Sequence, residues 1–394
     1  MNRKLNICIV IPAQNRYSET FIRNHIKYLP GNIFDLYGDW FPAFDANGER
    51  ISDQYINRSL FSKLLVRMCK VLPAFIVNRI KSSIKGYPYD EKFNRIAFGY
   101  FLKQKKIDVV LAEFMIKGIV IKNICSELNI PFVVHTHGGG DISIKEGLDT
   151  HLKSFPDLFL KANRVISVDS FSSSKLVEFG LQKEKLIQLG NGIDLNLFNI
   201  TKPSRNGPIF FAIGRFVDKK APYLTILAFS AVLKKHPDAK LKMAGSGNLL
   251  DCCVQLVKAL KIEKNVCFLG ILVPSKVADI MKESRAFVQH SLHSISGDSE
   301  GMPVSILEAM ACGLPVVSTY HNGISDTITH SIDGLLVEEN DIDTMAEYMI
   351  KLIEEPEYAD QLGINARKNV EENFEMSKVI QNLYSVLKNA VNNK

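Results

Sequence analysis

The feature that most constrains this chain is a regular alternation of short β-branched runs with amphipathic helical segments. In the first half the strand-length runs are LNICIVI (5–11), IDVVLAE (107–113), PFVVHTH (131–137) and RVISVD (164–169). Segments with helical spacing, such as ETFIRNHIKYL (19–29) and IKNICSEL (121–128), separate them. This alternation predicts a parallel sheet with helices on both faces.

The alternation pauses once and then starts again. Residues 190–208, GNGIDLNLFNITKPSRNGP, are rich in Asn, Gly and Pro and have no regular period, which is typical of a linker. Beyond it the strand-length runs return as IFFAIG (209–214), AKLKMAG (239–245), NVCFLG (265–270), RAFVQH (285–290) and LPVVST (314–319). The sequence therefore predicts an α/β protein with two tandem Rossmann-like, doubly wound domains that face a central cleft.

The predicted organisation has three parts. Residues 1–189 form the first domain and residues 190–373 the second, which 394 residues are enough to build. Residues 374–394 form a long amphipathic helix that we expect to pack back on the first domain, because its apolar face needs a partner.

Composition narrows the class of protein further. No run of about 18 apolar residues occurs, so nothing should span a bilayer, and the opening run MNRKLNICIVIPAQNR reads as a strand rather than a secretion signal. The seven cysteines show no C-x-x-C spacing. We therefore expect neither a zinc site nor a disulfide framework, and a reducing, cytoplasmic location.

The net charge of +6 is concentrated, because residues 58–106 hold 12 basic and 2 acidic side chains. Within them, residues 58–86 interleave cations with apolar residues at helical spacing. Such a segment can lie on an anionic membrane surface, as a peripheral contact at the inner face of the cytoplasmic membrane. The alternative is two core-packed helices with solvated basic faces. Nucleic acid is not expected as a partner, because no recognition motif or basic–aromatic platform is present.

The stretch GDSEGMPVSILEAMACGLPVV (297–317) places Glu300 and Glu308 around a mostly apolar segment. It follows a predicted strand, and PVSILEAMAC (303–312) reads as a helix with Pro303 at its first position. The free N–H groups at the start of a helix, together with its dipole, form an anion site. Glu308 would lie roughly 7–8 Å along the axis from that start, at 1.5 Å per residue.

This arrangement fits a nucleotide–diphosphate–sugar. Glu308 would accept hydrogen bonds from the ribose diol, and Glu300 would hold hydroxyls of the sugar. The diphosphate would lie at the helix start, near Gly301, Met302, Pro303 and Val304. Taken alone, two such glutamates are more often a solvated helix residue and an ordinary loop acid, so further residues must support the ligand.

Two cations supply that support. IFFAIGRFVDKKAP (209–222) ends a strand in Gly-Arg, and Lys220 follows Arg215 by five residues. A diphosphate leaving group needs cations or a metal, and Arg215 and Lys220 could provide two charges from one turn. Lys219 is expected to face solvent. No DxD-type carboxylate pair lies in a suitable loop, so we expect no metal and no other cofactor.

Glycines after two further strands would let a ligand approach the backbone. KMAGSGNLL (242–250) contributes Gly245 and Gly247, but no third glycine follows, which disfavours a NAD-linked dehydrogenase. In the first domain, HTHGGGDIS (135–143) places His137 beside Gly138, where the imidazole could contact the transferred sugar. A structural histidine explains the same residue about as well.

These motifs together resemble the retaining family-4 glycosyltransferases of GT-B fold. The resemblance rests on Glu300-x7-Glu308, GRFVDKK, AGSG, NVCFLG and NGIDLNLF in the expected order, and SETFIRNHI with GDSEG resembles the bacterial exopolysaccharide, colanic-acid-type branch. It is strong over residues 190–340 and looser over 1–190. Three departures are the loop PAQNRYSET without glycine, Ala221 where glycine is frequent, and His290 where proline is common.

The resemblance implies a nucleotide-sugar donor bound by the second domain and a glycan or lipid-linked acceptor bound by the first. It makes Glu308 the ribose ligand, Glu300 a donor-sugar ligand, Arg215 and Lys220 the diphosphate ligands, and His137 the sugar contact of the first domain. The nucleotide base would contact main chain around Gly270, with UDP and GDP as leading candidates.

The expected reaction transfers a hexose-type sugar with retention, by front-side displacement in which the departing diphosphate helps to accept the proton of the acceptor. Two other functions stay open. One is a nucleotide-sugar epimerase or phosphorylase on the same fold, and the other is a non-catalytic nucleotide- or carbohydrate-binding subunit.

Overall fold

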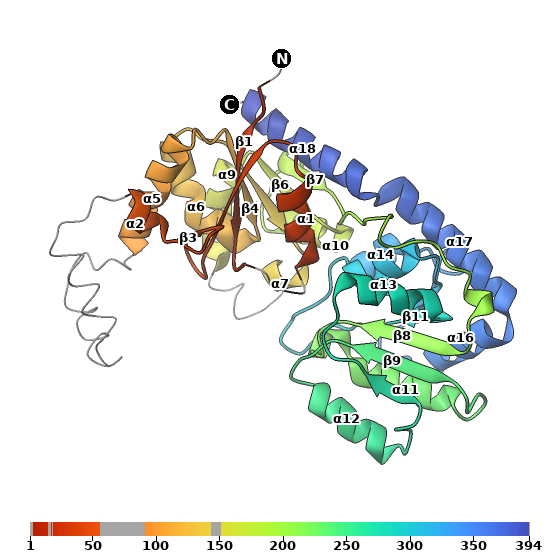
Figure 1. Ribbon diagram of the computed structural model, residues 1–394. Coiled ribbons are helices and arrows are strands. Elements are labelled where there is room, and N and C mark those ends of the chain that lie inside the picture. Colours follow the sequence, from red (N-terminus) through yellow and green to blue (C-terminus); the bar gives the residue numbers. More distant parts are fainter. Residues whose placement is uncertain (1–2, 15–16, 18, 56–90, 143–150, 394) are drawn as a thin grey trace, which may run out of the picture. The chain divides into compact units, whose positions relative to one another are not determined.

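The computed structural model describes residues 3–14, 17, 19–55, 91–142 and 151–393, which divide into two compact units (Figure 1). The first unit consists of Met1–Thr136, Lys153–Ile166 and Leu383–Lys394, and the second of His137–Leu152 and Ser167–Asn382. Residues 58–86 lie outside the described residues, so their contact with a membrane stays a prediction. Among the described residues, no helix is both long and apolar enough to cross a bilayer.

A seven-stranded sheet forms the core of the first half of the chain, in the order β3-β2-β1-β4-β5-β6-β7. Its strands are β1 Asn6–Ile11, β2 Asn32–Tyr37, β3 Phe44–Asp45, β4 Val109–Glu113, β5 Phe132–Thr136, β6 Arg164–Ser167 and β7 Leu186–Gln188. β1 pairs in parallel with β2 and β4, whereas the short β3 is antiparallel to β2. β1, β4 and β5 are almost wholly buried, which explains why their sequences read as continuous apolar runs.

The helices that accompany this sheet occupy the intervals between its strands. They are α1 Thr20–Tyr28, α2 Ile51–Tyr55, α5 Glu91–Gln104, α6 Met115–Glu127, α7 Gly139–Ile142, α9 Phe155–Lys161 and α10 Ser170–Glu178. The α18 helix, Met376–Asn392, runs from one unit into the other, because its residues from Leu383 onward group with the first unit.

The second sheet has six strands in the order β10-β9-β8-β11-β12-β13. They are β8 Ile209–Ile213, β9 Lys240–Ala244, β10 Val266–Phe268, β11 Ala286–Val288, β12 Val316–Thr319 and β13 Leu335–Val337. All its pairings are parallel. The chain order reverses between β8 and β11, and this switch point is where open α/β sheets bind ligands.

Helices cover both faces of the second sheet, with α13 and α14 on one face and α11 and α12 on the other (Figure 1). Their bounds are α11 Pro222–Val232, α12 Leu250–Ala259, α13 Pro274–Glu283, α14 Val304–Ala311, α15 Asn322–Thr327, α16 Ile342–Glu354 and α17 Pro356–Asn373. Successive residues of β8 serve two separate cores: Phe210 packs with Phe229 of α11, and Phe211 with Phe287. The period of two in a strand forces this division.

The predicted fold class is confirmed, with two parallel α/β sheets on either side of the linker. β7 ends at Gln188 and β8 begins at Ile209, on the two sides of residues 190–208. Four strands, β2, β3, β7 and β13, were not among those predicted. β3 has only two residues, β7 and β13 have three each, and β2 is mostly half-buried, so their apolar runs are short or interrupted.

Candidate donor site in the second unit

A shallow hollow, open to solvent, lies at the switch point of the second sheet. The ends of β8, β9 and β11 and the start of α11 line it, and its polar lining includes Arg215, Lys220, Thr225 and Gln289. The sequence prediction that Arg215 and Lys220 share one turn and face one space agrees with this placement. Arg215 is exposed, and Lys220 is largely buried.

Glu300 lies against Lys220. The ammonium Nζ of Lys220 is 3.0 Å from Glu300 Oε2 and donates a hydrogen bond of 3.3 Å to Gln289 Oε1. Glu300 is 7% exposed, so this ion pair is nearly dry. The structure therefore joins the predicted sugar ligand to the predicted diphosphate ligand by direct contact.

Lys219 does not face solvent, contrary to the prediction. Its side chain is buried, and its Nζ lies 3.0 Å from Asp298 Oδ1 and 3.5 Å from Glu300 Oε1. It also donates to the carbonyl oxygen of Ser299 at 3.2 Å. The turn η4, Asp218–Lys220, is a 3-10 helix, and its tighter winding lets both lysines reach the loop that carries Glu300.

The charges of this cluster fix its protonation state. Burial alone would raise the pKa of Glu300, but Lys220 and Lys219 outweigh it and hold that pKa at about 2. Burial lowers the pKa of Lys220, and Glu300 opposes this effect. Glu300 is thus ionised at neutral pH and keeps a buried cation beside the hollow.

The backbone of Glu300 is held as firmly as its side chain. Its N–H donates to Nε2 of His321 at 3.0 Å, and its carbonyl oxygen accepts from Nδ2 of Asn322 at 2.9 Å. His321 Nδ1 lies 2.6 Å from Glu339 Oε1, so Glu339 orients the imidazole. These groups come from the ends of β12 and β13, which the sequence analysis did not connect with Glu300.

The α14 helix begins at Val304, and Pro303 is its N-cap rather than its first residue. Pro303 has an extended ψ of 117°, so the first helical φ and ψ belong to the next residue. The first turn still reaches the hollow, because Ser305 Oγ donates to Gln289 Oε1 at 3.1 Å. Met302 does not line the hollow, since its side chain is buried in the core.

Glu308 is half-buried in α14, with apolar neighbours along most of the helix. Burial raises its pKa to about 8. Its carboxyl group makes no hydrogen bond or ion pair with the other described residues. A carboxyl group in such surroundings gains a partner when a diol binds, which suits the predicted ribose contact.

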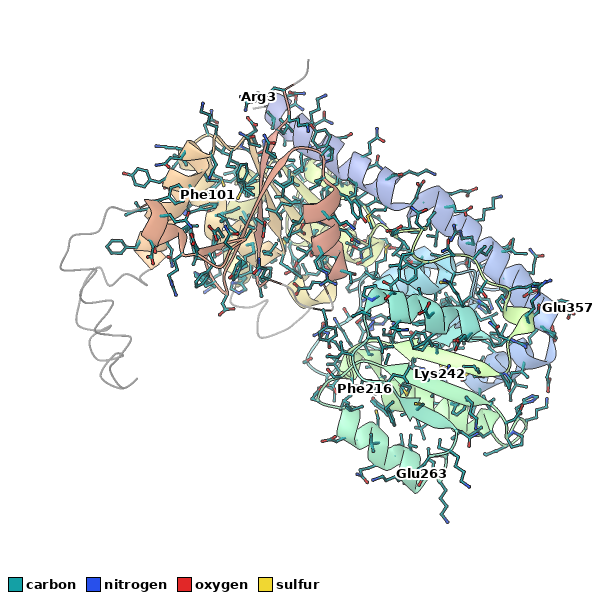
Figure 2. The ribbon with its side chains drawn as sticks, viewed as in Figure 1. Arg3, Phe101, Phe216, Lys242, Glu263 and Glu357 are labelled. Atoms are coloured by element: carbon teal, nitrogen blue, oxygen red, sulfur yellow. The ribbon has the colours of Figure 1, made fainter. Side chains whose placement is uncertain are left out.

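The glycines predicted to line the site have a backbone role as well. Gly245 has φ +123° and Gly247 φ +157°, and a Cβ on either would overlap a carbonyl oxygen, of Gly214 or Phe216 respectively. Phe216 N–H donates to Ser246 O at 2.9 Å, which joins the two turns; Phe216 is labelled in Figure 2. The Gly-Ser-Gly turn therefore shapes the wall that carries Arg215. Gly270 accepts from Gly245 N–H through its carbonyl oxygen at 2.7 Å.

His137 follows β5 and is half-buried. The next residue, Gly138, has φ +94°, and a Cβ on it would lie 2.6 Å from Cα of Gly301. The close approach of these two backbones explains why glycine stands at both positions. Their role in binding a ligand stays a prediction.

Five residues that hold the site together were not predicted as parts of it from the sequence, namely Gln289, Lys219, His321, Asn322 and Glu339. Gln289 stands directly after the buried β11, while His321 and Glu339 each stand two residues after a buried strand. A polar side chain in such a position is the signal that could have found them. Asn322 carries no such signal, because only the tertiary fold brings it to Glu300.

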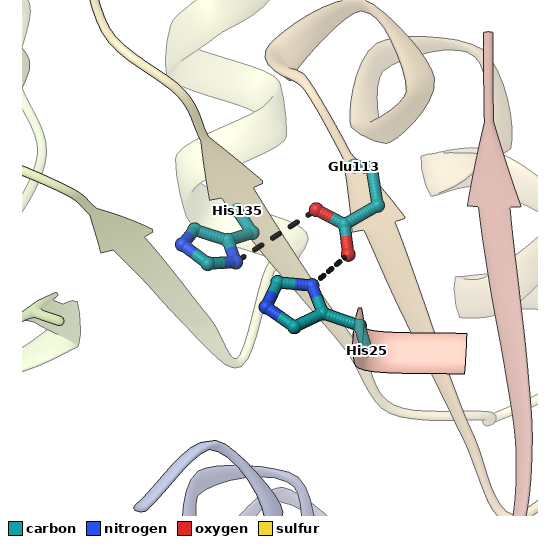
Figure 3. A group of neighbouring side chains, drawn as sticks. All are labelled: His25, Glu113 and His135. Carbon is teal, nitrogen blue, oxygen red and sulfur yellow. Dashed lines mark hydrogen bonds and ion pairs between the residues drawn. The ribbon is translucent and has the colours of Figure 1, made fainter. Parts of the chain in front are cut away.

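A second polar cluster lies in the first unit at the carboxyl ends of β4 and β5 (Figure 3). His25 of α1 places Nδ1 2.7 Å from Glu113 Oε1, and His135 Nδ1 lies 3.7 Å from Glu113 Oε2. The two rings stack with centroids 5.3 Å apart, and all three residues are at most 3% exposed. The two imidazoles lie against the Glu113 carboxylate, whose charge would be costly to bury without such partners.

Comparison with known proteins decides the class of this site. Residues 195–369 match the family described as glycosyl transferases group 1, over most of the second unit. This match covers less than half of the chain, and there the second unit resembles that family. The chain is a glycosyltransferase, and the two cations and Glu300 lie within the matched residues.

Relatives of this glycosyltransferase include proteins named for surface polysaccharides. It is 24% identical to the amylovoran biosynthesis glycosyltransferase AmsK of Erwinia amylovora, over 94% of this chain and 96% of that one. It is 25% identical to the UDP-Gal:alpha-D-GlcNAc-diphosphoundecaprenol alpha-1,3-galactosyltransferase of Escherichia coli, over 74% of this chain and 78% of that one.

Solved structures confirm the GT-B type of fold. Anabaena HepE in complex with UDP and glucose matches with a TM-score of 0.74 at 17% identity, over 98% of this chain and 99% of that chain. Sucrose-phosphate synthase from Thermosynechococcus elongatus matches with a TM-score of 0.70 at 17% identity, over 99% of this chain and 100% of that one.

Proposed function

We propose that this glycosyltransferase moves a hexose-type sugar from a UDP- or GDP-sugar to a glycan or lipid-linked saccharide, with retention and without a metal. The acceptor would belong to surface polysaccharide synthesis. Two relatives named for such polymers, and one named for a diphosphoundecaprenol acceptor, support this choice. UDP leads GDP as the donor nucleotide, since UDP appears in the names of a relative and of structures with this fold.

The observation that carries the proposal is the dry contact between Lys220 and Glu300 beside the hollow at the switch point. A diphosphate placed in the hollow would meet Lys220, Arg215 and the first turn of α14, so cations and helix N–H groups would share its charge. Glu300, on the loop before α14, would accept hydrogen bonds from the sugar. Glu308 would accept them from the ribose.

In the proposed mechanism the protein stabilises departure of the diphosphate rather than forming a covalent intermediate. Lys220 is held as a cation by Glu300, so its charge is in place before the bond breaks. The acceptor hydroxyl then attacks from the face that the diphosphate left, and a diphosphate oxygen accepts its proton. This route gives retention and needs no nucleophilic side chain. Cations at the diphosphate take the part that a metal has in other transferases.

Thermal unfolding in the presence of UDP, GDP, ADP or NAD tests the donor class. A ligand at 100 times its Kd stabilises the folded state by about 2.7 kcal/mol. A shift with UDP or GDP supports the proposal and selects the sugars to test. A shift with NAD alone contradicts it.

Product analysis tests the stereochemistry and the acceptor. With the selected donor and a lipid-linked or soluble saccharide, proton NMR should show the anomeric configuration of the donor retained in the product. The rate should persist in EDTA. An inverted product, or donor isomerised without acceptor, would contradict retaining transfer; the second result would indicate the epimerase alternative.

A further inference from the structure

Two consecutive residues hold the peptide groups around Glu300. His321 and Asn322 follow β12, and the first accepts from the N–H of Glu300 while the second donates to its carbonyl oxygen. Glu300 and His321 are both buried, and the imidazole of His321 is wholly so. One imidazole ring and one amide thus hold the main chain of the residue whose carboxylate lies beside Lys220.

Hydrogen-bond roles assign the tautomer of that ring. A backbone N–H can only donate, so Nε2 of His321 must carry a lone pair to accept from Glu300 at 3.0 Å. Nδ2 of Asn322, at 3.4 Å, presents a second donor to the same nitrogen. The proton of the neutral ring then sits on Nδ1, where it donates to Glu339 Oε1 at 2.6 Å.

The hydrogen-bond roles of the His321 ring also disfavour a metal bound to it. Ligand atoms of His293, His321 and Glu339 lie within 4.8 Å of one another and could surround a cation. A metal on Nδ1 of His321 would move the proton to Nε2, where it would face the N–H of Glu300. Two donors would then oppose each other in a buried site, which costs about 1–3 kcal/mol.

We propose that His321 is a positioning residue, oriented by Glu339, that holds Glu300 in place for the donor sugar only while its imidazole is neutral. This inference rests on the proposed role of Glu300 as the sugar ligand. It also makes the position of Glu300 depend on pH, because protonation of Nε2 turns a hydrogen-bond acceptor into a donor that faces the N–H of Glu300. The loop that carries Glu300 would then leave its place beside Lys220.

The groups around the ring set where this pH dependence lies. Those that face it are Glu339 after β13, His293 and His290 after β11, and Glu300 on the loop before α14. Burial lowers the pKa of His321, although the hydrogen bond to Glu339 opposes this effect. The neutral ring is thus favoured at pH 7, and protonation occurs on the acid side of the usual value for histidine.

Three variants test the proposal in kcat/KM for UDP-glucose, or for the donor that thermal unfolding selects, between pH 5 and 8. H321Q can place an amide oxygen where Nε2 was, and this oxygen accepts a hydrogen bond but does not titrate. H321L removes the acceptor. H236Q is the matched control, since His236 forms a histidine–carboxylate pair with Glu354 at 3.2 Å at the amino edge of β9.

Wild type and H236Q should both lose kcat/KM as the pH falls, through one protonation. H321Q should be active at pH 7.5 and lose this acid limb. H321L should lose roughly tenfold to a hundredfold in kcat/KM at every pH, because a buried N–H is left without its acceptor. Its affinity for UDP alone should stay unchanged, because UDP lacks the sugar. An unchanged acid limb in H321Q would overturn the proposal, and so would weaker binding of UDP in step with the donor sugar.

Nitrogen-15 NMR of the histidine rings gives a readout that does not need activity. The signal of one ring in the Nδ1–H tautomer, present in wild type at pH 7.5, should be absent in H321Q and is thereby assigned to His321. An Nε2–H tautomer for His321 overturns the proposal even if the variants fold poorly. If the Nδ1–H tautomer and the acid limb are found but E300Q turns over normally, the role of Glu300 fails and the link from His321 to the Glu300 loop stands.

Discussion

The adjacent lysines Lys219 and Lys220 of η4 have different roles, because their side chains point in different directions. Lys220 lines the hollow and contacts Glu300, whereas Lys219 points to Asp298 and the carbonyl oxygen of Ser299. We expect Lys220→Ala to reduce kcat roughly 10²–10³-fold, because it removes a preorganised charge at the leaving group. Steady-state kinetics with saturating donor measure the loss.

Lys219→Ala is the comparison within the same turn. Its loss leaves Asp298 without its buried cation, so it should lower the melting temperature more than Lys220→Ala does and lower kcat less. Lys240→Ala, on the exposed start of β9, controls for the loss of a surface charge. Normal turnover in Lys220→Ala would show that the charge of Lys220 has no part in the mechanism.

Glu308 should make stability depend on pH in the direction opposite to a paired carboxylate. Its pKa is raised to about 8, so the folded state binds a proton that the unfolded state releases near the ordinary value of 4.5. The free energy of unfolding therefore falls as pH rises from 4.5 to 8. Glu308→Gln keeps the shape of the neutral acid and removes this loss.

Urea unfolding of Glu308→Gln and wild type at pH 5, 7 and 8.5 measures the difference. The variant should gain stability over wild type as pH rises and level off above pH 8, and it should bind UDP more weakly. Glu263→Gln, an exposed acid of the loop before β10, is the control. A constant difference across this range would mean that Glu308 titrates as an ordinary surface acid.

At the scale of elements, the turns after β8 and β9 are joined through glycine. Gly245→Ala would place a methyl group against the carbonyl oxygen of Gly214 at a φ of +123°. We expect it to lower the free energy of unfolding by about 2 kcal/mol or more, from backbone strain and overlap together. It should also weaken UDP binding, because the wall that carries Arg215 must shift.

Gly207→Ala is the matched control. A Cβ there meets no atom within 4 Å, and no left-handed φ is required. The change should be neutral or stabilise by about 0.4–1 kcal/mol, through a less flexible unfolded chain. Equal losses in the two variants, measured by urea unfolding, would contradict the packing argument.

The elements themselves follow from sequence to different degrees. The buried strands β1, β4, β5, β8 and β12 read as apolar runs because both faces of a parallel sheet are covered. The start of α14 was placed one residue early, since the fixed φ of Pro303, −65°, suits a helix but its ψ was free to be extended. The value of such a ψ angle depends on where the following residues lie in the folded protein.

At the scale of the whole molecule, α18 links the two units along one continuous helix. Leu383 and Leu387, both fully buried, lie in the part that groups with the first unit. Each Leu→Ala change should lower the stability of that unit by about 2–5 kcal/mol. Calorimetry should show the loss in a transition that UDP does not raise.

Lys388→Ala, exposed on the same helix, should leave the calorimetric transitions in place. If the two leucine variants instead lower only the transition that UDP raises, the C-terminal part of α18 stabilises the second unit. The predicted packing of residues 374–394 would then be wrong.

The sequence by itself determined the two sheets, the linker and the chemical types at the donor site. Apolar period and turn residues are local properties, and Arg215, Lys220, Glu300 and Glu308 stand in motifs that can be read along the chain. Tertiary structure alone decided that Lys219 is buried, that Glu300 pairs with Lys220, and that His321 and Glu339 hold the Glu300 loop. These contacts join residues 18 to 81 positions apart along the chain. The order of the strands in the sheet brings these residues together, and this order cannot be read from their separation along the chain.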